Sequence, residues 1–385
     1  MSGWTVPLAD VVLDDADLEA VMDAYKSGWL SMGPRIEAFE AAFAAYTGTR
    51  HAFAVSSGTA ALHLMCLAAG LGEGDEVIVP ALTFVATVNA VRYTGAKPVF
   101  ADTAGPLEPW LSPAACERLI GPRTRAILHV EYGGHPGDVQ RMQELADRHG
   151  LLLLHDAAHS IGATVGDRQV GSLGKAAAYS FFANKNLAVG EGGMVITDDD
   201  DVARSLRLLR SHGMTTLTWD RHRGHASGYD VVALGFNYRM DEPRAALGVS
   251  RLAKLDAEIA QRARLDAGYR SALAGVLECP LAPVDGLGTA HHLFTVLLPE
   301  TVDRAAVRSA LAAGGVQTSV HYPPAHRFSF HAVDAHLPVT EDYAERTLTL
   351  PMFGHMTDAQ QQLVVAALVD AVGLAGGVRP RSDAA

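Results

Sequence analysis

Short apolar segments that alternate with amphipathic stretches, from about residue 51 to residue 210, constrain the fold of this chain most. The run Leu151 to Leu154 is apolar at every position, which is typical of a strand that is covered on both faces. Helices are predicted between the strands, for example over residues 138–150, where Val139, Met142, Leu145 and Ala146 share one face. The predicted strands read HAFAVSS, DEVIVP, KPVFAD, TRAILHVEY, LLLLHD, AAAYSFF and GMVITD.

Strands separated by helices indicate an α/β fold with a mostly parallel sheet. In such sheets, ligands bind beyond the carboxyl ends of the strands. Thr59, Asp156 and Ser180 each follow the end of a predicted strand. The sequence therefore predicts one binding site at this edge of the sheet.

The pattern changes after Asn237. Residues 242–277 read as one long helix rich in Ala, Leu and Arg. A strand over HHLFTVLLP, a helix over DRAAVRSALAAGG and a strand over VQTSVHYP follow. We therefore predict two domains, a large one over residues 1–250 and a smaller α+β domain over residues 251–385.

Composition excludes several classes of protein. Nearly half of the 385 residues are apolar and 19% are charged, which is typical of a well-packed globular enzyme. A net charge of −12 without a lysine-rich tract argues against nucleic acid or an anionic membrane as a partner. Three widely spaced cysteines, an N-terminus unlike a signal peptide and the absence of a membrane-length apolar run predict a cytoplasmic protein.

Three features of the sequence suggest one cofactor. Lys185 follows an apolar strand and precedes GEGG, Asp156 ends another strand, and a Ser-Gly-Thr turn opens a predicted helix. Pyridoxal phosphate needs an amine for imine formation, a carboxylate for its pyridine nitrogen and an anion site for its phosphate. A lone loop lysine is usually a solvated surface charge, but an apolar setting lowers the pKa of the amine toward the neutral form that the chemistry requires.

Asp156 and His159 each have a second interpretation. Asp156 follows four leucines and a histidine, where a carboxylate needs a partner, but its residue type also suits a helix N-cap. We expect it to pair with the pyridinium nitrogen. His159 is expected beside the cofactor, although a lone histidine is more often a core residue whose hydrogen bonds are satisfied.

The phosphate is expected at the Ser-Gly-Thr turn. The amides of Gly58 and Thr59, the Thr59 hydroxyl and the Ser180 hydroxyl are the candidate donors. The alternative is an ordinary N-capped helix. Phe84 is expected to stack on the cofactor ring rather than to fill the core.

Two histidine-containing regions of the sequence are candidate ligand sites. His321, His326, His331 and His336 cluster in the sequence, but without the spacing of a metal site, so no metal is predicted. Arginines and histidines are concentrated in RLLRSHGMTTLTWDRHRGH, where Arg221 and Arg223 suit a diphosphate. A solvated loop that binds no ligand is an equally weighted alternative to the diphosphate site.

With these residues in place, the chain resembles the DegT/DnrJ/EryC1/StrS family of sugar aminotransferases almost from end to end. The motifs that carry the resemblance are GWLSMGPRIEAFEAAFAAYTGTRHAFAVSSGTAALHL, TFVATVNAV, HDAAHSIGA, SFFANKNLAVGEGG, LGFNYRMDEPRAALG and YPPAH with LTLPMFGHMTDAQ.

The resemblance implies the fold type I arrangement of pyridoxal phosphate enzymes and a homodimer with shared active sites. It implies that Lys185 forms the imine, that Asp156 pairs with the pyridine nitrogen and that Thr59 and Ser180 hold the phosphate. Asn237 would reach the phosphate from the partner subunit. From the YPPAH motif, we expect Tyr322 and His326 to contact the substrate.

The resemblance also implies the reaction. Dehydratase relatives carry histidine in place of the lysine, so Lys185 favours amino transfer. We expect L-glutamate as the donor and a nucleotide-linked, dTDP-4-keto-6-deoxy type of hexose as the acceptor, in amino-sugar biosynthesis. The alternatives are a C3 keto-sugar, a cyclitol of the inosose type, and a non-catalytic relative that only binds the cofactor.

Overall fold

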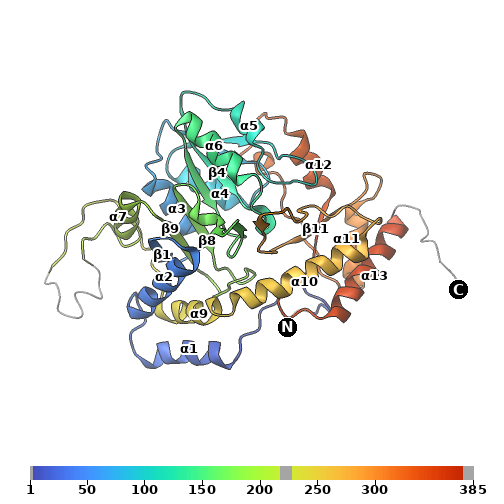
Figure 1. Ribbon diagram of the computed structural model, residues 1–385, viewed down its shortest axis with the longest axis horizontal. Coiled ribbons are helices and arrows are strands. Elements are labelled where there is room, and N and C mark those ends of the chain that lie inside the picture. The colour runs from blue at the N-terminus through green and yellow to red at the C-terminus, as the bar shows by residue number, and fades with distance from the viewer. Residues whose placement is uncertain (1–2, 217–227, 376–385) are drawn as a thin grey trace.

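The computed structural model describes residues 3–216 and 228–375 and contains a seven-stranded sheet, several of whose strands are labelled in Figure 1. The strand order is β1-β9-β8-β5-β4-β2-β3. Neighbours from β8 to β3 run parallel, whereas β9 runs antiparallel to β8 and β1, so the mostly parallel sheet is confirmed. All seven predicted strands are present as β1 (His51–Val55), β2 (Glu76–Pro80), β3 (Lys97–Ala101), β4 (Thr124–Val130), β5 (Leu152–Asp156), β8 (Ala176–Ser180) and β9 (Gly193–Thr197).

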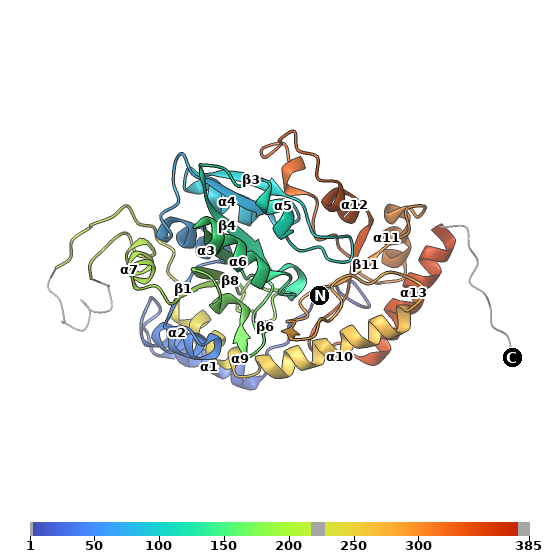
Figure 2. The same cartoon turned by 45° about the horizontal axis from the view of Figure 1, so that its top comes forward.

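Helices cover both faces of the sheet (Figures 1 and 2). These helices are α2 (Pro34–Thr47), α3 (Gly58–Ala68), α4 (Val85–Tyr93), α5 (Pro113–Glu117), α6 (Val139–His149), α7 (Asp200–Leu209) and α9 (Glu242–Leu252). Successive strand side chains point to opposite faces, so Leu154 packs with α3, α4 and α7 while Leu153 packs with α5 and α6. On the Leu153 face, α2 and α9 cover β1, β8 and β9.

The predicted helix over residues 138–150 is confirmed as α6. Its four expected core residues, Val139, Met142, Leu145 and Ala146, are all buried. Gly150 ends the helix in the left-handed conformation, with φ 63°, which glycine adopts without steric cost.

The single helix expected over residues 242–277 is instead two helices, α9 and α10 (Leu255–Leu273). The break falls at Lys254, whose ammonium group lies 2.8 Å from Asp17 of α1 (Asp15–Lys26) and 2.6 Å from Asp14. On one side of this junction α9 packs on α1 and α2, and on the other side α10 packs on the C-terminal helix α13 (Asp358–Ala375). The ion pair with α1 lies at the junction between the two. The sequence pattern was continuous because both helices are rich in Ala, Leu and Arg.

The C-terminal part contains a two-stranded antiparallel sheet of β11 (Phe294–Leu297) and β12 (Thr347–Leu350). The predicted strand over HHLFTVLLP is β11 and the predicted helix that follows it is α11 (Arg304–Ala313); α12 (Pro338–Arg346) precedes β12. The strand predicted over residues 316–323 is wrong. That segment makes only isolated bridges, from Val316 to Val6 and from Ser319 to Thr349, because it exchanges backbone hydrogen bonds with β12 at Ser319 alone.

The N-terminal segment reaches this part of the fold, where Val6 lies in one core with residues of α10, α11, β11, β12 and α13. The division into domains at residue 250 stays a prediction. The remaining elements are short: β6 (Thr164–Val165), β7 (Arg168–Gln169), β10 (Leu287–Gly288) and 3-10 turns at Tyr132–Gly134, Val170–Ser172 and Ala325–Arg327.

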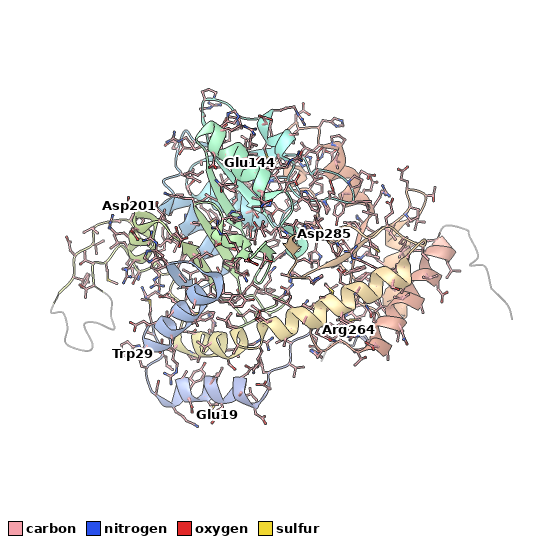
Figure 3. All side chains as sticks on the ribbon, in the orientation of Figure 1. Glu19, Trp29, Glu144, Asp201, Arg264 and Asp285 are labelled. Carbon is pink, nitrogen blue, oxygen red and sulfur yellow. The ribbon has the colours of Figure 1, made fainter. Side chains whose placement is uncertain are left out.

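Glu19 on α1 and Arg264 on α10 are exposed charged residues on the outer faces of their helices (Figure 3). Within the described residues, no helix combines the length and apolar character that a membrane span requires.

Candidate active site

A cavity of about 380 Å³ lies beyond the carboxyl ends of the parallel strands. It brings together Gly58, Thr59, Phe84, Asp156, His159, Ser180, Lys185 and Tyr322, eight of the residues predicted from sequence. The rest of its lining consists of Ser57, Leu62, Thr83, Ala86, Val130, Ala158, Phe182, Asn184, Glu191 and His321. The structure thus brings these eight residues together at one edge of the sheet.

Asp156 ends β5 with its carboxyl group buried. Thr87 of α4 donates a hydrogen bond to Oδ2 at 2.6 Å, and the Ala158 amide donates to Oδ1 at 3.2 Å. Burial raises the pKa of Asp156 to about 6, although both hydrogen bonds act in the opposite direction. The carboxyl group is therefore held in one orientation and can share a proton with a buried base near neutral pH.

Thr87 and Thr83 were not identified from the sequence. Their hydroxyls lie 2.6 Å apart, and Thr83 also lines the cavity. A signal was present, because the two threonines flank Phe84 at a spacing of four residues in TFVAT, which places them on one side of a helix start.

Lys185 lies in the connection between β8 and β9, and its backbone N–H donates to the Phe182 carbonyl at 2.9 Å. Burial lowers the pKa of the amine to about 8, while the neighbouring Asp156 opposes this shift. A substantial fraction of the amine is therefore neutral near physiological pH. This neutral form is the one that attacks a carbonyl carbon or accepts a proton.

The phosphate end of the cavity is the N-terminus of α3. Ser57 caps this helix by accepting a hydrogen bond from the Ala60 amide at 3.1 Å. The amides of Gly58 and Thr59 come earlier in the helix, where no intrahelical carbonyl is available to accept from them. A Cβ on Gly58 would lie 2.7 Å from Cβ of Ser180, so only glycine fits here. The Ser180 side chain thus packs directly against the helix start, as the phosphate assignment requires.

His159 is buried and hydrogen-bonded on both ring nitrogens. The Gly133 amide donates to Nδ1 at 3.3 Å, so the ring carries its proton on Nε2, which lies 3.0 Å from the Tyr322 hydroxyl. Burial lowers the pKa of His159 well below its usual value, and the charge of Lys185 acts in the same direction. His159 is thus a neutral hydrogen-bond donor to Tyr322.

Phe84 lines the cavity as expected, but its ring is 55% exposed and lies 5.8 Å from the Tyr322 ring centroid. It therefore is not a core residue. An exposed ring at the cavity rim is free to stack on a planar group.

Two predicted residues lie away from the cavity. Asn237 is exposed and forms an isolated backbone bridge with Ser211. His326 is fully buried, with Nε2 2.9 Å from Glu341, so the structure corrects its expected contact with substrate. Arg221 and Arg223 lie outside the described residues.

The clustered histidines separate in the fold. His321 lines the cavity, whereas His331 lies 2.9 Å from Asn89 and His336 is exposed. Across residues 3–216 and 228–375, no group of three or more His, Cys, Asp or Glu residues has the arrangement of a metal site.

The donor set fits pyridoxal 5′-phosphate. A buried carboxyl group with a raised pKa suits a pyridine nitrogen, and an amine with a lowered pKa suits an aldehyde. The helix start at Gly58, with Ser180 against it, suits the phosphate.

Known proteins resemble the chain over almost its whole length. The spore coat polysaccharide biosynthesis protein SpsC of Bacillus subtilis (strain 168) is 38% identical over 380 residues, or 95% of this chain and 97% of SpsC. The crystal structure of S. venezuelae DesV is 39% identical, with a TM-score of 0.85 and coverage of 92% of this chain and 94% of DesV. The sugar aminotransferase CalS13 from Micromonospora echinospora is 28% identical, with a TM-score of 0.87 and coverage of 95% and 100%.

The sequence profile of the DegT/DnrJ/EryC1/StrS aminotransferase family matches residues 12–369. This match and the donor set of the cavity lead to the same cofactor and the same chemistry. The chain therefore belongs to the DegT/DnrJ/EryC1/StrS family and is a pyridoxal 5′-phosphate-dependent aminotransferase of fold type I.

Proposed function

We propose that this aminotransferase moves an amino group from L-glutamate to the keto group of a nucleotide-linked 4-keto-6-deoxyhexose, of the dTDP-sugar type. The main support for amino transfer is that Lys185 and Asp156 line one cavity. Burial lowers the pKa of Lys185 to about 8 and raises the pKa of Asp156 to about 6. The names of SpsC, a polysaccharide biosynthesis protein, and CalS13, a sugar aminotransferase, support a sugar acceptor.

The residues of the chain divide the work of binding. When bound, pyridoxal phosphate supplies a carbonyl group for amines and a ring that accepts electrons. Asp156 would hold the ring nitrogen, and the hydrogen bond from Thr87 fixes the orientation of its carboxyl group. The amides of Gly58 and Thr59 and the hydroxyls of Thr59 and Ser180 would hold the phosphate.

Lys185 moves the protons. Its neutral Nζ would take a proton from the α-carbon of glutamate, and the resulting ammonium group would give that proton to C4′ of the cofactor. In the second half of the reaction, Nζ delivers a proton to the sugar carbon that receives the amino group. A pKa of about 8 suits both directions, because neither the amine nor the ammonium form is rare at neutral pH.

Tyr322 is proposed to contact the acceptor sugar from the cavity wall, where His159 orients its hydroxyl. Arg221 and Arg223 are proposed to bind the diphosphate of the nucleotide, because guanidinium groups pair with phosphate oxygens in a bidentate way.

A cytoplasmic homodimer with shared active sites is part of the proposal. Asn237 is exposed on the described surface, as a residue that reaches the phosphate of a partner subunit would be. The preceding segment also exposes apolar side chains, with Leu234 89% accessible and Val231 and Val232 more than half accessible. Burial of these apolar side chains against a second subunit would stabilise a dimer.

The absorption spectrum of the purified enzyme tests this function. The band of the lysine-bound cofactor should bleach on addition of L-glutamate and return when a nucleotide-linked 4-keto-6-deoxyhexose follows. A panel with C3 keto-sugars and inososes identifies other acceptors. Return of the band with an inosose alone would contradict the nucleotide-sugar assignment, and a protein that never acquires the band would contradict catalysis itself.

A further inference from the structure

A fully buried carboxylate and imidazole lie behind the active site. Oε1 of Glu131 is 2.6 Å from Nδ1 of His155, and both side chains are 0% exposed. Neither residue lines the cavity. Burying such a pair carries a desolvation cost, so its place in the fold needs a reason.

The pair is attached to the strand ends that form the site. Glu131 directly follows Val130, the last residue of β4, and Val130 pairs with Asp156 in the sheet. His155 directly precedes Asp156. Because successive strand side chains point to opposite faces, the Glu131–His155 contact fixes β5 from one face while Asp156 enters the cavity from the other.

The same carboxylate also reaches the segment that carries His159. The Ser160 hydroxyl lies 3.4 Å from Oε2 of Glu131. Glu131 also begins the turn whose Gly133 amide donates to Nδ1 of His159. Movement of Glu131 would therefore disturb both Asp156 and His159.

The imidazole is used at one nitrogen only. Among the described residues, Nε2 of His155 has no hydrogen-bond partner, and it faces Gly174, where an added Cβ would lie 2.9 Å from it. Because a carboxylate oxygen only accepts, the Nδ1–H of the ring is directed at Glu131. The imidazole therefore has one contact to satisfy, and that contact is the carboxylate.

We propose that Glu131 is a positioning residue for the cofactor, and that its buried carboxylate, bound to His155 and Ser160, holds Asp156 and His159 in their working positions. The proposal rests on pyridoxal phosphate at Asp156 and is independent of the acceptor sugar.

The charge of Glu131 gives this role a measurable signature. Burial is the main cause of the raised pKa of Asp156, and Glu131 adds to it. Thr87, the Ala158 amide and the charge of Lys185 lower that pKa. The other titratable groups that interact electrostatically with Asp156 are Cys66 and Tyr322, whose own pKa values burial raises.

The first experiment compares the wild type with Glu131→Gln, which keeps the shape of the side chain but removes its charge. We expect the pH midpoint of the bound-cofactor absorption band to move to lower pH, because loss of a nearby negative charge disfavours protonated forms. We also expect the Kd for pyridoxal phosphate to rise about tenfold, in the range seen when the partner of an orienting contact is removed.

Glu242→Gln is the matched control. Glu242 is fully buried and accepts hydrogen bonds from the Arg35 and Ile36 amides at 3.0 Å, but it does not line the cavity. It should lose thermal stability without any change in the midpoint. If Glu131→Gln behaves like Glu242→Gln, losing stability while keeping the midpoint and cofactor affinity, the residue is merely structural and the proposal is wrong.

A double-mutant cycle with His155→Asn tests whether the two residues act as one unit. Because both single changes break the same contact, the double variant should bind pyridoxal phosphate no more weakly than the weaker single variant. Additive losses of affinity would overturn the proposal. The cycle also keeps the test open if Glu131→Gln folds poorly, since His155→Asn alone should weaken cofactor binding. Because no sugar is used, failure here would leave the proposed acceptor untouched.

Discussion

The hydroxyl of Thr87 donates a hydrogen bond to Oδ2 of Asp156 at 2.6 Å across the gap between α4 and β5. Thr83 lies 2.6 Å from Thr87, so two hydroxyls form a short chain that ends on the carboxylate. Since the bond from Thr87 lowers the pKa of Asp156 against the effect of burial, it favours the charged form that a pyridinium needs.

Thr87→Val should weaken cofactor binding. Loss of a hydrogen bond to a charged acceptor costs about 1.5–3 kcal/mol, which corresponds to a rise of at least tenfold in the Kd for pyridoxal phosphate. The pKa of Asp156 should also rise further above about 6, since the lowering contact is gone. Fluorescence titration of the apoenzyme measures the affinity. Thr83→Val is the control, and an equal loss in both variants would show that the bond to Asp156 is not the cause.

Lys185→Ala should abolish covalent attachment of the cofactor, because the amine that forms the imine is gone. Borohydride reduction followed by mass spectrometry should find pyridoxyl-lysine at residue 185 in the wild type and no adduct in the variant. Lys175→Ala is the control, since Lys175 ion-pairs with Asp199 away from the cavity. An adduct that persists in Lys185→Ala would identify another lysine as the reactive one.

The pH dependence of cofactor capture should follow the amine of Lys185. Its pKa is lowered from 10.5 to about 8, and only the neutral amine attacks. The rate of capture by the apoenzyme should therefore rise with pH up to about 8 and level off above it. Stopped-flow absorbance measures the rate. A rate that keeps rising toward pH 10 would mean that the amine has an ordinary pKa and is not desolvated.

Gly58→Ala should disturb the phosphate end of the site. The new Cβ would lie 2.7 Å from Cβ of Ser180, so the side chain or the start of α3 must move. We expect the affinity for pyridoxal phosphate to fall by about tenfold or more, as for a lost charge-assisted hydrogen bond. Gly121→Ala, where a Cβ meets nothing within 4 Å, is the control for the substitution. Unchanged affinity in Gly58→Ala would argue against a phosphate at this helix start.

The site was largely predictable because its residues follow strand ends, and strand ends are marked by apolar runs. Asp156 after LLLLH and Ser180 after AAAY are examples, and the sheet places both at one edge. Thr87 was missed because its spacing from Thr83 indicates only a shared side of the helix start, while its acceptor, Asp156, lies 69 residues away in the sequence. The orientation of Tyr322 depends on the tautomer of His159, which only the contact with the Gly133 amide determines.

Errors arose where tertiary contacts override local pattern. The segment over residues 316–323 has strand-like composition, but it exchanges backbone hydrogen bonds with β12 at Ser319 alone. His326 belongs to a motif near the cavity, yet its ring turns inward to Glu341. In both cases the contact that determines the structure depends on the tertiary fold or on the direction of a side chain. The order of residues in the sequence shows neither of these.

The reversed direction of β9 has a mechanical consequence for Lys185. Antiparallel neighbours can be joined by a loop at one edge of the sheet, so the connection over residues 181–192 leaves and re-enters the sheet at the same edge. The segment that carries Lys185 is therefore held at both ends by two adjacent strands. Its amine travels by rotation of its own side chain, so the distance that a proton is carried in each turnover is bounded by the length of one lysine.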